Sequence, residues 1–372
     1  MKLVQRIAVT VCIALACCTA ARGQAPAPTQ VSPAVRGEQQ FAGFGDFKLQ
    51  NGGVIHDFRI GYRTVGKLNA EKSNAVLWPT WLDGKSADLV QSVAPRGVDE
   101  EKYFVILVDA IGNGVTTSPS NSKSQPRMQF PEFTIRDMVE SQRRLVTEVL
   151  HLTRLRAVMG VSMGGMQAFE WAVAYPDFMD LAITLVGSPQ STSYDKLFWT
   201  LEMDAIETDP AWNNGNPTGP LTRAYLLMAE IGSMQLTSPA YRVAHTKPQE
   251  FDSFLAELKK SPPGDAGTAS NQIRQRQAIN ALDIGAEFHV SLEEAAKRVR
   301  AKMLVFLSPQ DHTVNPEPAL KFADALGAPV VILDSSCGHI SLACVSAGPT
   351  VAQFLNDPAS VHSMTLHELS AH

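Results

Sequence analysis

The sequence has few cysteines, no long run of charge of one sign and no internal repeat. Three of its five cysteines lie in the first 18 residues, which leaves Cys337 and Cys344. Its 32 basic and 37 acidic residues form no strongly basic patch, which argues against nucleic acid as a partner. No pair of its nine histidines has helical ligand spacing with an acid in support, so we predict no metal and no cofactor.

No apolar run near the N-terminus is long enough to cross a membrane. A basic start, an apolar run over residues 7–18 and small residues after it predict a secretory signal peptide over residues 1–25. The protein is therefore expected to be exported, to the periplasm or the extracellular space. A lipid anchor at Cys18 is disfavoured because Cys17 precedes it. Residues 26–44, rich in Pro, Ala, Gln and Ser, are predicted to form a linker.

The two remaining cysteines permit one disulfide. An even number of cysteines in an oxidising compartment is compatible with a Cys337–Cys344 bridge. The other interpretation is that both are small apolar residues that never meet, because the sequence does not give the distance between their Cα atoms.

One serine between two glycines organises the chain. A strand-type run over 155–159 ends at Gly160-Val161-Ser162-Met163-Gly164, and a helix-type run follows to residue 175. This is the G-x-S-x-G pattern of a nucleophile in its strand–turn–helix setting. The glycines would relieve crowding in the turn, and the helix N-terminus would favour negative charge beside the serine. The competing interpretation is a surface turn.

Short apolar runs alternate with helical patterns along the chain. Two alternating runs, 44–49 and 54–64, predict an antiparallel pair at a sheet edge. Continuous apolar runs, typical of buried parallel strands, lie at 75–78, 103–108, 155–159, 181–186, 302–307 and 329–333. A helix that Thr134 and Asp137 cap is expected to run to about Leu150. These patterns predict an α/β fold with a mostly parallel, doubly wound sheet.

One long segment departs from this alternation. Residues 188–301 show no convincing buried strand, and their apolar residues recur at helical spacing in 197–206, 221–234, 251–258 and 273–282. We therefore predict a core over 45–187 and 302–358, and a helical insertion over 188–301 that lies on the strand ends as a lid. Residues 359–372 are predicted to be a polar tail, with His362, His367 and His372 on a solvated, fraying end.

The serine needs a base, and the base needs an anion to orient it. On a sheet of this kind, the acid and then the histidine follow late strands. Asp311 follows the run at 302–307 and His339 follows the run at 329–333, so both join Ser162 as the candidate catalytic triad.

Two neighbouring residues are rivals for these roles. His312 is expected to be an exposed loop residue beside the acid, and Asp334 is expected to anchor the loop that carries His339. For the oxyanion, two backbone N–H donors are needed. Met163 should supply one, and the loop of residues 80–84 should supply the other.

Several strings resemble the homoserine O-acetyltransferase family of enzymes with the α/β-hydrolase fold. They lie at 62–69, 73–77, 133–139, 162–167 and 209–213. The most specific are Thr-Ile-Arg-Asp-Met at 134–138 and Ser-Met-Gly-Gly-Met-Gln at 162–167. The resemblance covers about residues 45 to 355. It implies the α/β-hydrolase fold, places Ser162, Asp311 and His339 on the family's triad, and places Leu82 near its second oxyanion donor.

The chain departs from this family at two positions that matter for the substrate. The family usually has an acidic residue after the catalytic histidine, where this chain has Ile340, and an arginine in the first lid helix, where this chain has Met203. Apolar side chains cannot hold the charged ends of homoserine. We expect Trp81, Met203 and Ile340 to line the substrate pocket. Acetyl-CoA is a cytoplasmic metabolite, so an exported enzyme would lack that donor.

These observations together predict an exported serine hydrolase that cleaves a small or medium ester, lactone or thioester through an acyl-enzyme. One alternative is an acyltransferase of the homoserine O-acetyltransferase type, in which an alcohol or amine replaces water. A second is a non-catalytic binding protein on the same fold. The expected partner is a small-molecule acyl substrate, and the sequence is compatible with a homodimer.

Overall fold

The computed structural model describes residues 36–260, 262 and 264–368. The predicted signal peptide, Cys18, residues 26–35 of the predicted linker and His372 lie outside the described residues. Within those ranges, no helix is both long and apolar enough to cross a lipid bilayer.

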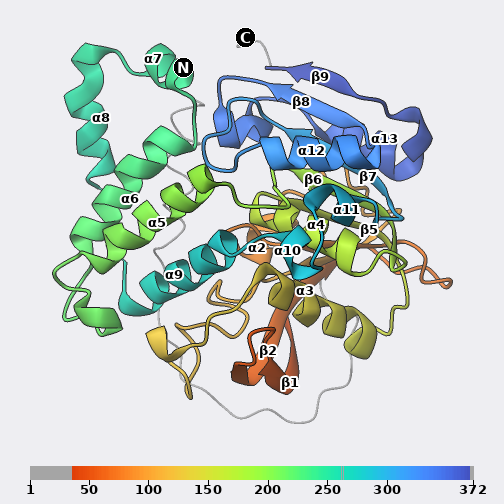
Figure 1. Ribbon diagram of the computed structural model, residues 1–372, viewed down its shortest axis with the longest axis horizontal. Helices are drawn as coiled ribbons and strands as arrows, with labels where there is room; N and C mark the ends of the chain where they lie inside the picture. Colours follow the sequence, from red (N-terminus) through yellow and green to blue (C-terminus); the bar gives the residue numbers. More distant parts are fainter. Residues whose placement is uncertain (1–35, 261, 263, 369–372) are drawn as a thin grey trace.

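A single sheet of nine strands forms the centre of the described chain, in the order β1-β2-β4-β3-β5-β6-β7-β8-β9 (Figure 1). The pairs β1–β2 and β2–β4 are antiparallel, and all later neighbours are parallel. The strands are β1 (Gln40–Lys48), β2 (Val54–Val65), β3 (Ala75–Pro79), β4 (Phe104–Val108), β5 (Leu155–Val161), β6 (Met179–Leu185), β7 (Lys302–Leu307), β8 (Val330–Asp334) and β9 (Met364–His367). The predicted mostly parallel α/β architecture is confirmed.

Helices cover both faces of the sheet because the strands are apolar on both sides. Within β3, Leu77 packs with one core cluster, and Val76 and Trp78 pack with the other. The first cluster includes residues of α3 (Ile135–Arg144), α4 (Met163–Ala174) and α12 (Glu317–Leu326). The second includes residues of α2 (Ser86–Val90) and α13 (Gly348–Asn356). The sheet is therefore buried between two helical layers, as a doubly wound fold requires.

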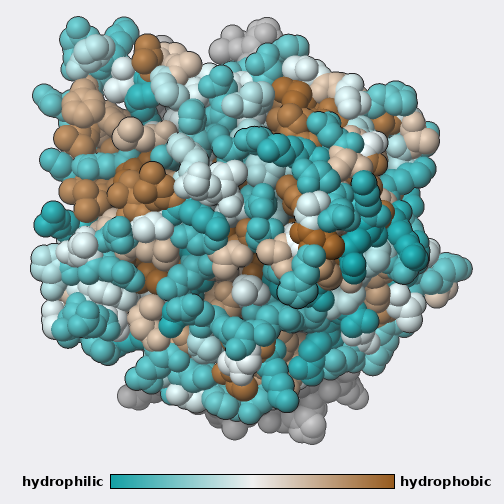
Figure 2. Space-filling model, in the orientation of Figure 1, coloured by the Kyte–Doolittle hydropathy of each residue, from teal (hydrophilic) through white to brown (hydrophobic). Residues whose placement is uncertain are grey.

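A helical segment separates β6 from β7. It contains α5 (Ser193–Glu207), α6 (Thr222–Gln235), α7 (Pro239–His245), α8 (Phe251–Leu258), α9 (Ala266–Asn280), α10 (Ile284–Glu287) and α11 (Leu292–Ala296). Large apolar side chains are exposed on it at Tyr194, Leu197, Leu201, Met234, Leu236, Val243 and Phe251. Figure 2 shows apolar surface on the side formed by α5, α6 and α8. This segment carries most of the large exposed apolar side chains of the described chain.

Three predicted boundaries need correction. Strand β1 begins at Gln40, so the last residues of the predicted linker belong to the sheet. The helix expected to reach Leu150 is α-helical only to Arg144 and then becomes a π-helical turn. Part of the predicted polar tail forms β9, and within it His367 Nδ1 lies 2.9 Å from Asp334 Oδ2. A short edge strand with alternating half-exposed residues leaves too weak a pattern for prediction.

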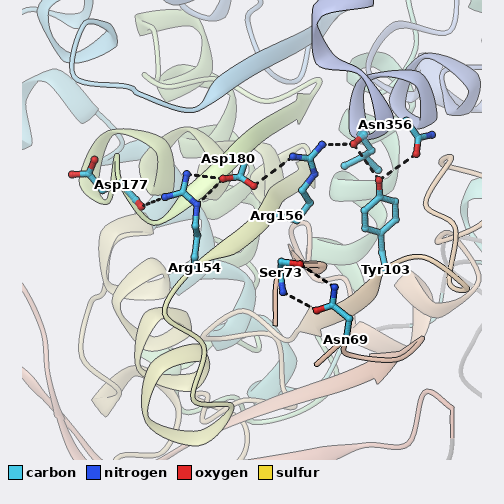
Figure 3. Close-up of polar contacts among 9 residues, drawn as sticks. Asn69, Ser73, Tyr103, Arg154, Arg156, Asp177, Asp180 and Asn356 are labelled. Carbon is cyan, nitrogen blue, oxygen red and sulfur yellow. Dashed lines mark hydrogen bonds and ion pairs between the residues drawn. The ribbon is translucent and has the colours of Figure 1, made fainter. Parts of the chain in front are cut away.

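Ion pairs occupy the end of the sheet where the parallel strands begin. A cavity of about 310 Å³ there is lined by residues that include Arg154, Arg156 and Asp180. Figure 3 shows the polar contacts of Asp180 with Arg154 and Arg156. Arg154 Nε donates to Asp180 Oδ1 over 2.6 Å, and Arg156 Nη2 donates to the carbonyl oxygen of Leu355 over 2.6 Å. Since these guanidinium groups already have partners, they serve to tie β5 to β6 and to α13.

Candidate active site

Ser162 occupies a strained turn between β5 and α4. Its φ is +55° and its ψ is −123°, a conformation that costs a non-glycine residue about 1–3 kcal/mol. A Cβ atom on Gly160 would lie 2.1 Å from the carbonyl oxygen of Gly164, and a Cβ on Gly164 would lie 2.6 Å from that of Pro79. The two glycines are therefore required for the turn to close. The helix α4 begins at the next residue and directs its N-terminus at the serine.

The structure brings Ser162, His339 and Asp311 together in one chain of hydrogen bonds. The Nε2 atom of His339 lies 2.9 Å from Ser162 Oγ, and its Nδ1 atom lies 2.7 Å from Asp311 Oδ2. The side chain of His339 is 10% exposed and that of Asp311 is 2% exposed. This is the geometry in which an oriented imidazole can take the proton of a serine hydroxyl.

The carboxylate of Asp311 is fixed by its own loop. Its Oδ1 atom accepts hydrogen bonds from the N–H groups of Thr313 and Val314, each over 2.8 Å. The hydroxyl of Thr313 in turn donates to the carbonyl oxygen of Gln235, at the end of α6. Only Oδ2 remains directed at His339, so the loop decides which oxygen orients the imidazole.

The predicted oxyanion donors lie at the ends of β3 and β5. Among the described residues, no hydrogen bond takes up the backbone N–H of Leu82 or that of Met163. The N–H of Gly84 donates to the carbonyl oxygen of Trp81 over 3.0 Å, so residues 81–84 form a tight turn. Free N–H groups at these two places are what a developing oxyanion requires.

The remaining predicted residues have varied surroundings. Ile340 follows His339, and its N–H donates to the carbonyl oxygen of Leu236. Trp81 packs against the core cluster that contains Trp78. Met203 packs in a separate cluster inside the helical segment, with Ile206 and Trp212. The role of Trp81, Met203 and Ile340 in a substrate pocket stays a prediction.

The two rival residues take no part in the hydrogen-bonded triad. Asp334 is paired with His367 of β9. The expectation that His312 is exposed is wrong: it is half-buried, and no group of the described residues forms a hydrogen bond with its Nε2 atom. The loop folds inward at this point because its neighbours Asp311 and Thr313 are buried.

A buried ion pair that the sequence does not indicate lies beside the turn of residues 81–84. The side chains of Arg276 of α9 and Glu202 of α5 are 5% and 8% exposed, and Arg276 Nε lies 2.7 Å from Glu202 Oε2. Arg276 Nη1 also lies 3.7 Å from Asp83 Oδ2. Burial lowers the pKa of Arg276, but the carboxylates of Glu202 and Asp83 more than offset this and raise it. No local pattern signals such a pair, because its members are far apart in the sequence.

A disulfide closes the loop that carries the histidine. Cys337 and Cys344 are bonded, with their Cα atoms 6.5 Å apart, and His339 lies between them. The carboxylate of Glu368 lies within 4.8 Å of both sulfur atoms. Because the sulfur atoms are bonded to each other, they offer no thiolate to a metal ion.

Removing this disulfide should loosen the histidine loop. We expect the double variant Cys337→Ala/Cys344→Ala to lower the free energy of unfolding by about 2 kcal/mol, as for a short closed loop. Activity should fall a few-fold because His339 would sample more positions. Denaturant unfolding and steady-state kinetics measure both effects. Reductant should lower the activity of the natural chain and leave that of the double variant unchanged. Full activity with both thiols alkylated would contradict this expectation.

Comparisons with known proteins identify the fold family of the chain. The model of the alpha/beta hydrolase fold family matches residues 78–343. An ethyl acetate hydrolase of Pseudomonas veronii is 37% identical over 182 residues, which are 48% of this chain and 52% of that protein. A homoserine O-acetyltransferase of Geotalea daltonii is 30% identical over 331 residues, covering 79% of this chain and 90% of that protein.

A solved structure is similar over nearly the whole described chain. The acetyl esterase MekB superposes with a TM-score of 0.78 at 27% sequence identity, covering 87% of this chain and 98% of that one. This chain spans about half the length of the esterase relatives it matches in sequence.

Proposed function

Because the chain belongs to the α/β hydrolase fold family and is homologous to homoserine O-acetyltransferases, we propose that it is a serine-dependent ester hydrolase that works through an acyl-enzyme. The observation that carries this proposal is the hydrogen-bond chain from Ser162 through His339 to Asp311. Esterases and acyltransferases among its relatives support the reaction class.

The reaction uses each group in turn. As Ser162 Oγ attacks the ester carbonyl carbon, its proton passes to Nε2 of His339. The N–H groups of Met163 and Leu82 stabilise the negative charge on the carbonyl oxygen. The alcohol then leaves with the proton from His339 and an acyl-serine remains. Water attacks the acyl-serine with His339 again as base, which releases the carboxylic acid and restores the hydroxyl.

Water is favoured as the acceptor because apolar residues stand at two positions that would have to hold the charged ends of an amino acid. By resemblance to the homoserine enzymes, Ile340 and Met203 take the positions of an acid and an arginine. Arg276, the buried arginine nearby in the fold, is already paired with Glu202 and Asp83. A zwitterion would lose its hydration without gaining partners, so a small uncharged ester is the better substrate.

Export is part of the proposal. The Cys337–Cys344 disulfide supports it, since disulfides persist mainly in oxidising compartments. An exported enzyme would meet water and extracellular esters but not acetyl-CoA, which agrees with hydrolysis as the net reaction.

One experiment separates hydrolysis from transfer. We expect p-nitrophenyl acetate to yield acetate at a rate that homoserine does not change, with less than about a tenth of the acetyl groups found on homoserine, because Ile340 and Met203 cannot hold its charged ends. Mass spectrometry of the products, with and without homoserine and with acetyl-CoA as an alternative donor, gives the ratio.

The other outcomes each support a different function. O-acetylhomoserine formed faster than acetate would overturn hydrolysis in favour of acyl transfer. If no acyl donor is consumed and an organophosphonate fails to label Ser162, the chain is a binding protein on this fold.

A further inference from the structure

The turn that presents Leu82 is held at both of its ends by glutamine side chains. On its N-terminal side, Gln167 Nε2 of α4 donates to the carbonyl oxygen of Thr80 over 3.1 Å. On its C-terminal side, Gln275 Oε1 of α9 accepts from the N–H of Asp83 over 3.0 Å. The first glutamine is five residues from Ser162, whereas the second belongs to the helical segment between β6 and β7.

Gln275 is built into this contact and has no freedom to turn away. Its side chain is fully buried, and its Nε2 atom donates to the carbonyl oxygen of Ile111 over 3.0 Å. Both ends of the amide are therefore satisfied by the backbone of loops that follow β3 and β4. An amide that joins two backbones in a buried place fixes their relative position.

The residue that Gln275 contacts is itself in an uncommon conformation. Asp83 has a φ of +60°, in the left-handed region that a non-glycine residue rarely adopts. Its carboxylate accepts a hydrogen bond from Gln272 Nε2 over 3.1 Å and lies near Arg276. One face of α9 contacts Asp83. The contacts come from residues spaced i, i+3 and i+4 on this helix, namely Gln272, Gln275 and Arg276.

We infer that Gln275 is a positioning residue for the oxyanion site, and that the helical segment thereby completes the catalytic machinery of the core. Gln275 takes the N–H of Asp83 and holds it away from the site, so the preceding N–H, that of Leu82, stays directed at the developing oxyanion. This inference rests on the proposed function, because it assigns a task to Leu82. It adds that α9, besides covering the core, sets the geometry of transition-state stabilisation.

The test compares two glutamine variants on the same helix. Gln275→Met keeps the side-chain volume and removes both hydrogen bonds. Gln277→Met removes an amide whose Oε1 atom, within the described part of the chain, accepts from Arg274 alone, so it is the matched control. The main readout is the rate at which a fluorophosphonate modifies Ser162. In that step Ser162 Oγ bonds to phosphorus, fluoride leaves, and the hydroxyl proton passes to His339.

Removing one oxyanion donor lowers the reaction rate about 10²–10³-fold. A donor that is present but less well positioned should lower the rate by a smaller factor. For Gln275→Met we expect labelling and kcat to fall about tenfold with KM within about twofold, and we expect Gln277→Met to match the natural chain. Gln275→Glu keeps an acceptor for the Asp83 N–H and should recover part of the loss. A fall confined to KM would mean a role in substrate binding and would overturn the inference.

The failures of the two proposals are distinguishable. If the natural chain is not labelled, the proposed function fails and the inference fails with it. If the natural chain is labelled and folded Gln275→Met is labelled at the same rate, only the inference fails. If Gln275→Met does not fold, the test rests on Gln275→Glu. A labelling rate of Ser162 below about a hundredth of that in the natural chain, with the fold intact by circular dichroism, would then contradict positioning through the acceptor oxygen.

Discussion

Replacing Ser162 with alanine should lower the rate of ester cleavage about 10⁵-fold and abolish labelling by organophosphonates. The Nε2 atom of His339, 2.9 Å from the hydroxyl, would have no nucleophile to activate, so no acyl-enzyme would form. The fold should persist, because alanine keeps the Cβ atom and the serine side chain has one hydrogen bond to the described residues, the one to His339. Initial rates with p-nitrophenyl acetate and intact-protein mass spectrometry measure the two effects.

A second serine variant controls for the loss of a hydroxyl as such. Ser360 is exposed and makes its hydrogen bonds with Gln353 and Asp357, outside the triad. Ser360→Ala should keep the activity and the labelling of the natural chain. If Ser162→Ala retained more than about a hundredth of the activity while properly folded, another group would be the nucleophile and the proposed mechanism would be wrong.

The turn around Ser162 could be predicted from the sequence because its causes are local. Gly160, Ser162 and Gly164 lie within five residues of one another, and the contacts that exclude a Cβ atom at both glycines arise inside this strand–turn–helix unit and at the end of β3. The order of strands along the chain then identified Asp311 and His339 as neighbours of the serine. Chain order supplied the neighbourhood of the triad, although the serine and histidine are 177 residues apart.

The residues that hold the catalytic groups in position could not be predicted in this way. Gln275 meets Asp83 across 192 residues, and neither residue belongs to a motif that reports the contact. The helix α9 buries polar side chains such as Gln275 and Arg276 on faces where apolar residues are expected. The apolar residues therefore recur at helical spacing only in the last turns of this helix, and the sequence predicts only those turns. Tertiary packing, which pairs each buried polar group with a distant partner, decided these positions.

Replacing Asp311 with asparagine should lower kcat about 10⁴-fold without changing the fold. The carboxylate of aspartate has two acceptor oxygens, whereas the amide of asparagine has one. The N–H groups of Thr313 and Val314 already point at Oδ1, so the amide oxygen must take that position and the NH₂ group must face His339 Nδ1. The imidazole would then present a lone pair at Nδ1 and carry its proton on Nε2. In that tautomer it cannot accept the proton of Ser162.

The rival acid provides the matched comparison for this tautomer argument. Asp334 pairs with His367 on the exposed edge of the sheet, so Asp334→Asn should change kcat less than about twofold. Steady-state kinetics of both variants, with KM determined separately, test the pair, and labelling of Ser162 should slow in Asp311→Asn only. Equal losses in the two variants, or near-natural kcat in Asp311→Asn, would show that the orientation of His339 does not depend on the carboxylate of Asp311. The imidazole would then require another partner, and His312, whose Nε2 atom has none among the residues that the structure describes, is the residue to replace next.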